Sequence, residues 1–96
     1  MASDHDVARA LAFFEACDDR GLLQEVLRGI RPRAAAEVRR LTSRGQEPPP
    51  PREIGAAPEA LTQPQALQTV KDTTDFGQLQ ALARAIGRRV EELGSG

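Results

Sequence analysis

Apolar residues recur at helical spacing along most of this chain, and this periodicity narrows its possible folds more than any other feature. The longest example has seven members: Phe76, Leu79, Leu82, Ala83, Ile86, Val90 and Leu93. β-branched residues never cluster, and apolar and polar residues nowhere alternate over the length of a strand. Because this spacing is typical of helices and not of half-buried strands, the sequence predicts an all-α fold, a small bundle of four to five helices.

Five segments follow the helical period. Their expected ranges are about 4–17, 20–30, 32–44, 63–72 and 76–93. Residues that favour helix N-caps precede four of them: Ser3, Asp18 or Asp19, Thr62, and Asp75. Gln78 follows Asp75 by three positions, so we expect a capping box in which the glutamine side chain turns back to the cap residue. Gly45 suits the left-handed position that follows a helix C-terminus.

Prolines mark two interruptions. Pro32 biases Arg31 away from helical angles, so a break is predicted between the second and third helices. The run from Pro48 to Pro51 predicts a polyproline II rod of roughly 12 Å, at about 3.1 Å per residue. The expected organisation is therefore one small helical domain, 1–96, with a helical half, a proline-rich linker and a second helical half: 3–45, 46–58 and 59–94.

Charge and composition exclude several classes of protein. The chain has 13 Lys and Arg against 14 Asp and Glu, a net charge of −1, whereas a nucleic-acid-binding domain usually shows a basic excess. No stretch approaches the roughly 20 apolar residues of a membrane-spanning helix. No basic region precedes an apolar run, as it does in a signal peptide. The single cysteine, Cys17, excludes an internal disulfide. We therefore expect a cytoplasmic protein without an integral membrane segment.

No arrangement of residues indicates a reaction. His5, the only histidine, lies among acidic residues and has no fixed partner for acid–base or metal chemistry. Cys17 lies near a helix C-terminus and beside two aspartates, which disfavours a reactive thiolate. Glu91 and Glu92 are neighbours in sequence and do not face each other on a helix. We expect no enzyme, and no catalytic, cofactor-binding or metal-ligating residues.

Two segments together resemble a known family. Residues 10–30 read ALAFFEACDDRGLLQEVLRGI, an apolar helix, an acidic turn and Gly-Leu-Leu opening a second apolar helix. Residues 61–87 read LTQPQALQTVKDTTDFGQLQALARAIG, where Pro-x-Ala-Leu leads into apolar helices. The chain is thus similar to the small helical family catalogued as domain of unknown function 1641, most strongly at Gly21, Leu22, Leu23, Pro64, Ala66 and Leu67. Members are commonly encoded beside molybdenum-dependent formate dehydrogenases. The resemblance implies an accessory subunit that links such an enzyme to the membrane quinone pool.

The predicted function is that of a non-enzymatic accessory or adaptor protein, which presents an amphipathic helix face to a partner subunit or to a second copy. Aromatic residues are only 3% of the chain, and a chain of this size buries a modest core, so association is expected. The expected docking residues are Phe76, Leu79, Leu82, Ile86 and Val90, with Arg84 and Arg88 on the rim. Aspartate at Leu82 and Ile86 would then abolish partner binding or dimerisation. Any membrane association would be peripheral and through the partner.

Two alternatives stay open. A homo-oligomeric helical signalling or interaction domain would assemble through charged faces, so salt would dissolve its complexes. A helix-turn-helix DNA binder would use residues 61–89, although Arg84, Arg88 and Arg89 lie at the wrong end of the recognition helix.

A second arginine-rich stretch fits a protein interface, where arginine is enriched: Arg28, Arg31, Arg33, Arg39, Arg40 and Arg44.

Overall fold

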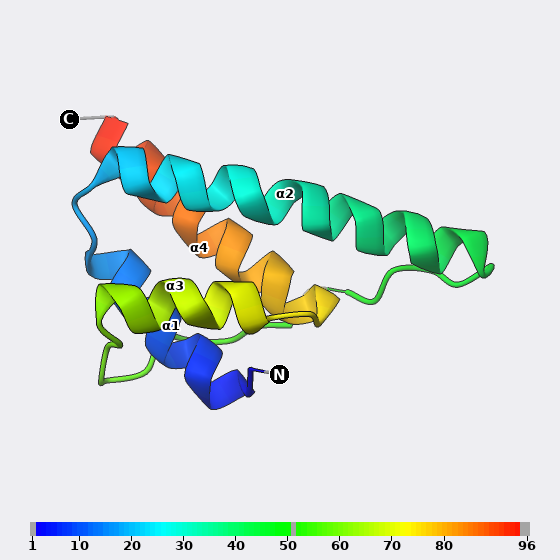
Figure 1. Ribbon diagram of the computed structural model, residues 1–96, viewed down its shortest axis with the longest axis horizontal. Helices are drawn as coiled ribbons and strands as arrows, with labels where there is room; N and C mark the ends of the chain where they lie inside the picture. The colour runs from blue at the N-terminus through cyan, green and yellow to red at the C-terminus, as the bar shows by residue number, and fades with distance from the viewer. Residues whose placement is uncertain (1, 51, 95–96) are drawn as a thin grey trace.

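Every regular element is an α-helix within residues 2–50 and 52–94, the part of the chain that the computed structural model describes (Figure 1). This part holds four helices: α1 (Asp4–Ala16), α2 (Arg20–Ser43), α3 (Gln63–Asp72) and α4 (Phe76–Gly94). The predicted all-α fold with four to five helices is confirmed. None of the described helices combines the length and the apolarity that crossing a membrane requires.

α2 is one continuous helix of 24 residues, so the predicted break at Pro32 is wrong. A proline inside a helix leaves the carbonyl four residues earlier without its donor and crowds the preceding turn. Pro32 and Arg28 are both exposed, so the interruption of the hydrogen-bond pattern lies at the surface of the molecule. The buried side chains of α2 all precede the proline, and Arg33 just after it donates to backbone carbonyls at the end of α3. Tertiary contacts thus hold both sides of Pro32 in the same helix.

Several helix ends follow the local signals of the sequence. Ser3 and Thr62 accept hydrogen bonds from backbone amides in the first turns of α1 and α3, and Gln65 completes a capping box with Thr62. Gly45 has a φ of 72°, in the left-handed region. The amides of Gly45 and Gln46 donate to carbonyls of the last turn of α2, at 3.0 and 2.9 Å, as in a Schellman motif.

The second predicted capping box, at the start of α4, is only half present. Asp75 accepts a hydrogen bond from the Gln78 amide at 3.0 Å, as an N-cap does. The Gln78 side chain instead donates to the Ala2 carbonyl and the Asp4 carboxylate, at 3.0 and 2.9 Å. Gln78 is 4% exposed, because it is buried against the start of α1. A residue predicted to cap its own helix therefore joins two helices.

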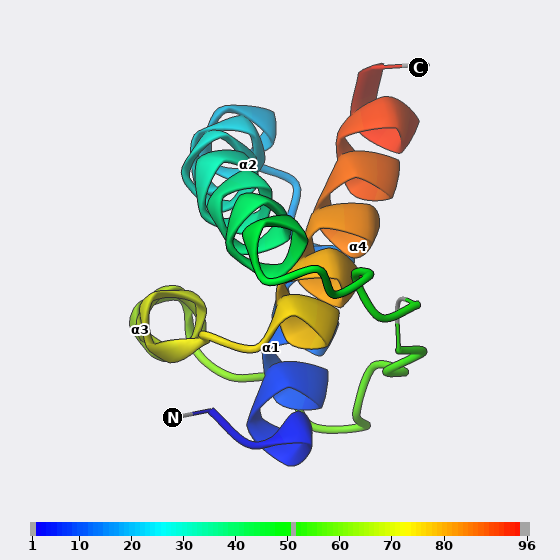
Figure 2. The same cartoon turned by 90° about the vertical axis from the view of Figure 1, so that its right-hand side faces the viewer.

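One hydrophobic core joins the two helical halves. α4 packs against both α1 and α2, and α3 packs against α1 (Figure 2). The buried cluster draws on all four helices and on two residues outside them: Ala2, Val7, Ala10, Leu11, Phe14, Leu23, Leu27, Ile30, Leu61, Ala66, Val70, Leu79, Leu82 and Ile86. The two halves on either side of the proline-rich segment are therefore packed as a single unit.

The residues that follow the proline run are fastened along α1. We call residues 46–61 the strap. The amides of Ala57 and Leu61 donate to carbonyls of α1 at 3.0 and 3.2 Å, and the Ile54 side chain packs against the core. The first three prolines of the run are exposed and lie outside regular structure, and the fourth, Pro51, lies outside the described residues. The strap therefore contributes contacts to the fold as well as connecting its halves.

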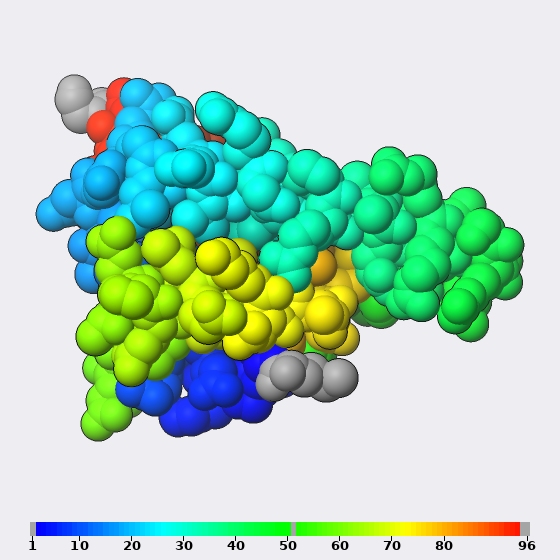
Figure 3. Space-filling view, in the orientation of Figure 1, coloured from blue at the N-terminus to red at the C-terminus, as the bar shows by residue number. Residues whose placement is uncertain are grey.

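The second half of α2 projects beyond the other helices, as Figures 1 and 3 show. We call residues 33–44 the arm. The molecule measures 41 × 27 × 20 Å along its principal axes, and the arm accounts for one end of the longest axis. Ala34, Val38 and Leu41 continue the core-facing side of α2 along the arm, but they are only half-buried.

Candidate functional site

The helix face predicted to bind a partner lies inside the protein. Phe76, Leu79, Leu82 and Ile86 are 6%, 2%, 0% and 0% exposed. α1 and α2 pack on α4 and cover this face. The expectation that it is open to a partner is therefore corrected. In a chain with few aromatic residues, burying the longest apolar stripe within the chain's own core is the most favourable arrangement, because it removes the most apolar surface from water.

The other predicted docking residues lie at the surface of α4. Arg84 and Arg88 are exposed, on the side of α4 that faces α1 and the strap. Val90 is half-buried and lines a groove between α4 and α2. The structure therefore separates residues that the sequence pattern had placed on one interface.

Arg33 is used to hold α3 in place. Its guanidinium donates to the Val70 carbonyl at 2.8 Å and to the Thr73 carbonyl, where α3 ends. The last carbonyls of a helix have no partner within the helix, and a cationic donor there is favourable. Arg33 therefore satisfies backbone groups of another helix and is not free for a ligand.

Arg52 of the strap joins the N-termini of two helices. Its guanidinium lies 3.1 Å from the Asp4 carboxylate of α1 and 2.6 Å from the Asp75 carboxylate that caps α4. All three side chains are about half exposed, so each pair adds at most about 1 kcal/mol. The cluster holds the strap against the helix ends.

Arg89 of α4 binds residues that the sequence analysis considered as candidates for chemistry or for a helix cap. Its Nε donates to the Cys17 carbonyl at 2.9 Å, and its other nitrogens lie 2.6 Å from Asp18 and 3.2 Å from Glu92. This contact fastens the turn between α1 and α2 to α4. Cys17 itself is half-buried beside the core. These groups stabilise the fold.

No metal site stands out in the described part of the chain. There, no three His, Cys, Asp or Glu side chains come together in a way that could hold an ion. His5 is exposed in the first turn of α1.

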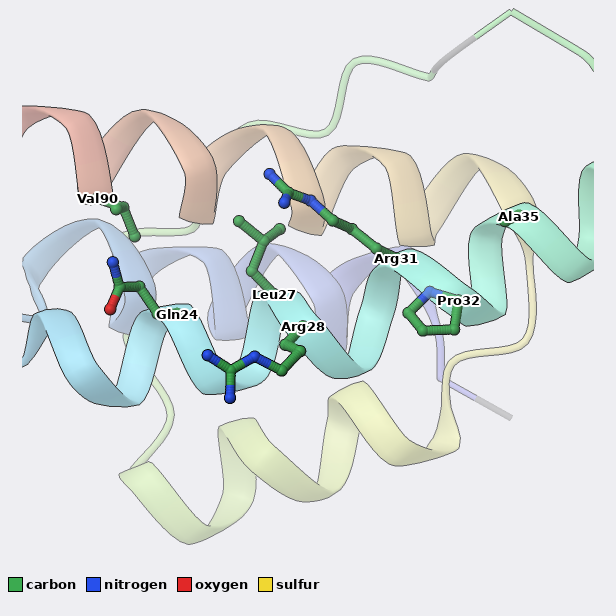
Figure 4. A pocket seen from close by; sticks show the side chains of 7 residues that line it. All are labelled: Gln24, Leu27, Arg28, Arg31, Pro32, Ala35 and Val90. Atoms are coloured by element: carbon green, nitrogen blue, oxygen red, sulfur yellow. The ribbon is translucent and has the colours of Figure 1, made fainter.

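A groove runs between α2 and α4, and we call it the α2–α4 groove. Its lining residues are Gln24, Leu27, Arg28, Arg31, Pro32, Ala35 and Val90. Figure 4 shows Leu27 of α2 and Val90 of α4 pointing into the space between the two helices, with Arg31 extending toward α4 and Arg28 lying along the near side of α2. Most of the groove is therefore apolar, with two guanidinium groups beside it.

The two arginines of the groove have no acidic partner among the described residues. Arg28 and Arg31 are exposed and belong to none of the ion pairs in this part of the chain. The nearest acid further along α2, Glu37, accepts hydrogen bonds from Arg40, which lower the pKa of its carboxyl. Arg28 and Arg31 thus stay exposed and without an ion pair in this part of the chain, although Glu25 lies three residues before Arg28 on the same helix.

A second groove lies between α2 and α3, and its positively charged residues have polar or acidic groups beside them. Its lining residues are Leu22, Glu25, Val26, Gly29, Arg33, Leu67, Val70 and Lys71. Its arginine, Arg33, already donates to α3, and its lysine lies in the same lining as a glutamate. We therefore favour the α2–α4 groove as the candidate site.

Comparison with protein-family models, with curated proteins and with solved structures found no match to this chain. The resemblance to the accessory proteins of formate dehydrogenases therefore stays a prediction. The sequence pattern indicated an interface role for Arg28 and Arg31 but did not place them at a groove. One available signal was spacing, since Gln24, Arg28, Arg31 and Ala35 follow one helix face without an acidic residue.

Proposed function

We propose that this protein is a non-enzymatic helical adaptor that binds another protein chain at the α2–α4 groove. The observation that carries the proposal is the pairing of an apolar groove with two arginines, Arg28 and Arg31, that no described acid neutralises. Protein interfaces are enriched in arginine, and their energetic centres combine arginine with desolvated apolar contacts. The adaptor role is retained from the sequence, and the docking site moves from the buried face of α4 to the α2–α4 groove, which α2 lines for the most part.

The partner class follows from the resemblance described above. An accessory subunit of a formate dehydrogenase, or of a related redox complex, would dock on a catalytic or membrane-linked subunit. The protein would then be cytoplasmic and would reach a membrane only through that partner. The formate dehydrogenase subunit is therefore the first partner to test.

The test uses two neighbouring alanines of α2. Ala35 lines the groove and Ala36 does not, and both are exposed on the same helix. A photo-crosslinking amino acid is placed at each position in turn, in cells that make the protein naturally. We expect irradiation to join the Ala35 position, and not the Ala36 position, to a distinct second protein, which mass spectrometry identifies. Replacing Arg31 by Glu should remove that product.

Three outcomes would contradict the proposal. One is equal crosslinking at both alanines, and another is the absence of any product. The third is a product that contains only two copies of this chain, which would favour the homo-oligomeric alternative. Light scattering at low and high salt checks the same point, because that alternative predicts a salt-sensitive species near twice 10.4 kDa.

A further inference from the structure

We propose that the occupant of the α2–α4 groove is an amphipathic α-helix of the partner, with acidic residues along the edge that meets Arg28 and Arg31. This inference rests on the proposed function and adds the chemistry of the bound segment. It makes a prediction that a defined peptide can test without knowledge of the natural partner.

The shape of the groove favours a helix as the occupant. The two walls are helices, and the described residues include no strand whose edge could pair with an extended peptide. Four of the seven lining residues are apolar, Leu27, Pro32, Ala35 and Val90. Leu27 is 8% exposed and belongs mostly to the core, and the side chain of Ala35 is small enough to let another backbone approach α2. A helix that lays its apolar face into such a groove is a common mode of recognition.

The positive charges beside the groove favour a bound helix that carries acidic residues along one edge. Arg28 and Arg31 are three residues apart on one helix, so their side chains emerge from the same face. Two acidic residues one turn apart on a bound helix could meet both guanidinium groups. Arginine also pairs with carboxylates through parallel hydrogen bonds, which fixes the orientation of the ligand as well as attracting it.

The distribution of charge argues against a symmetric pairing of two copies through their α2 helices. Residues 28–44 contain six arginines and one glutamate, a net charge of +5. The whole chain carries −1, so the remaining residues carry −6. Two α2 helices meeting at this groove would bring like charges together, which costs free energy.

The same distribution argues against a nucleic acid. A phosphate backbone would meet the acidic remainder of the molecule as well as the arginines, and it would leave the apolar lining residues of the groove uncovered. Proteins that bind nucleic acids place aromatic side chains or a continuous basic surface at such sites. The described lining of the groove contains no aromatic residue. An acidic helix covers both the apolar and the basic parts.

The experiment measures binding of two fluorescent model helices by anisotropy, with the full chain as receptor. One peptide has a Leu and Ala face flanked by glutamates, and the other has lysine in place of every glutamate. We expect the acidic peptide to bind at least about tenfold more tightly. Raising the salt concentration should weaken binding of the acidic peptide, because the arginines are exposed and their attraction is screened.

Variants of the chain localise the binding. Arg28→Glu combined with Arg31→Glu should weaken the acidic peptide about tenfold or more and should strengthen the lysine peptide. Ala35→Glu should weaken the acidic peptide, because the new carboxylate can pair with Arg31 one turn away. Ala36→Glu is the matched control, with the same charge change on the same helix, and it should bind like the unaltered chain. Circular dichroism confirms that each variant is folded.

Several results would overturn the inference: equal affinity for the two peptides, an equal loss in Ala36→Glu and Ala35→Glu, or no charge reversal in the double variant. Displacement of the acidic peptide by a DNA duplex that binds more tightly would assign the arginines to nucleic acid. If the peptide test fails while crosslinking at Ala35 stays specific, the adaptor function stands and only the acidic helix is excluded. If the crosslinking also fails, the proposed function falls with it.

Discussion

Glycine has opposite roles at two positions of the long helices. A Cβ atom at Gly29 would meet nothing within 4 Å. A Cβ atom at Gly77 would lie 2.9 Å from Nε of Arg52 and 3.1 Å from a carboxylate oxygen of Asp75. Gly77 therefore leaves room for Arg52 to lie across the start of α4, whereas Gly29 only adds conformational freedom to the unfolded chain.

Alanine substitutions at these glycines should separate the two roles. Gly29→Ala should raise the free energy of unfolding by about 0.5–1 kcal/mol, because alanine favours the helix and meets no neighbour. Gly77→Ala should gain nothing, because the methyl group displaces Arg52 from its ion pairs. In an Arg52→Ala background, Gly77→Ala should recover part of the gain expected at Gly29, because only the Asp75 carboxylate then crowds the new methyl group. Urea unfolding measures all four variants, and equal gains at both glycines in the unaltered background would refute this account.

At the scale of the elements, α2 shows how tertiary contacts override a local helix breaker. Its first half is held by the core and its second half begins with Arg33, which binds the end of α3. Pro32 lies between these attachments and is exposed. The helix can therefore continue through the proline, although one backbone hydrogen bond is lost there.

Replacing Pro32 should show by how much the proline lowers the free energy of unfolding. Pro32→Ala should raise the free energy of unfolding by about 1–3 kcal/mol, because it restores the hydrogen bond to the Arg28 carbonyl and removes the crowding by the ring. The helical circular dichroism signal of the folded protein should stay the same, because α2 is already continuous. A large increase in that signal would mean that α2 is broken at Pro32 in solution.

For the whole molecule, the decisive feature is that α4 fills the core between α1 and α2. Leu82 and Ile86 have no exposed surface. Aspartate at these positions would bury a charge in the core and unfold the chain, so those substitutions cannot report on partner binding. The arm, by contrast, carries apolar residues that lie outside this core.

Truncation of one leucine in the core and one in the arm tests this difference in burial. Leu82→Ala should lower the free energy of unfolding by about 2–5 kcal/mol, because it opens a cavity in the core. Leu41→Ala, on the half-buried side of the arm, should lower it by less than about 1 kcal/mol. Chemical unfolding followed by circular dichroism gives both values. Similar losses at the two positions would show that the arm is covered in solution, for example by a second copy.

The local signals could be read from the sequence because they act between residues five or fewer apart. The caps at Ser3 and Thr62 and the turn at Gly45 appear where they were predicted, as does the helical period itself. Each depends on backbone hydrogen bonds or steric preferences within one turn. The all-α class follows from them.

Only the tertiary structure decided how these elements are used. The turn of Gln78 toward α1, the continuity of α2 through Pro32 and the burial of the α4 stripe all depend on contacts between distant residues. Helical periodicity shows that a face is apolar, but it does not show whether the same chain or another one covers it. That choice depends on which faces can be brought together within one chain to bury the most apolar surface. For this reason the α2–α4 groove, with Arg28 and Arg31 beside it, appears only once the helices are packed.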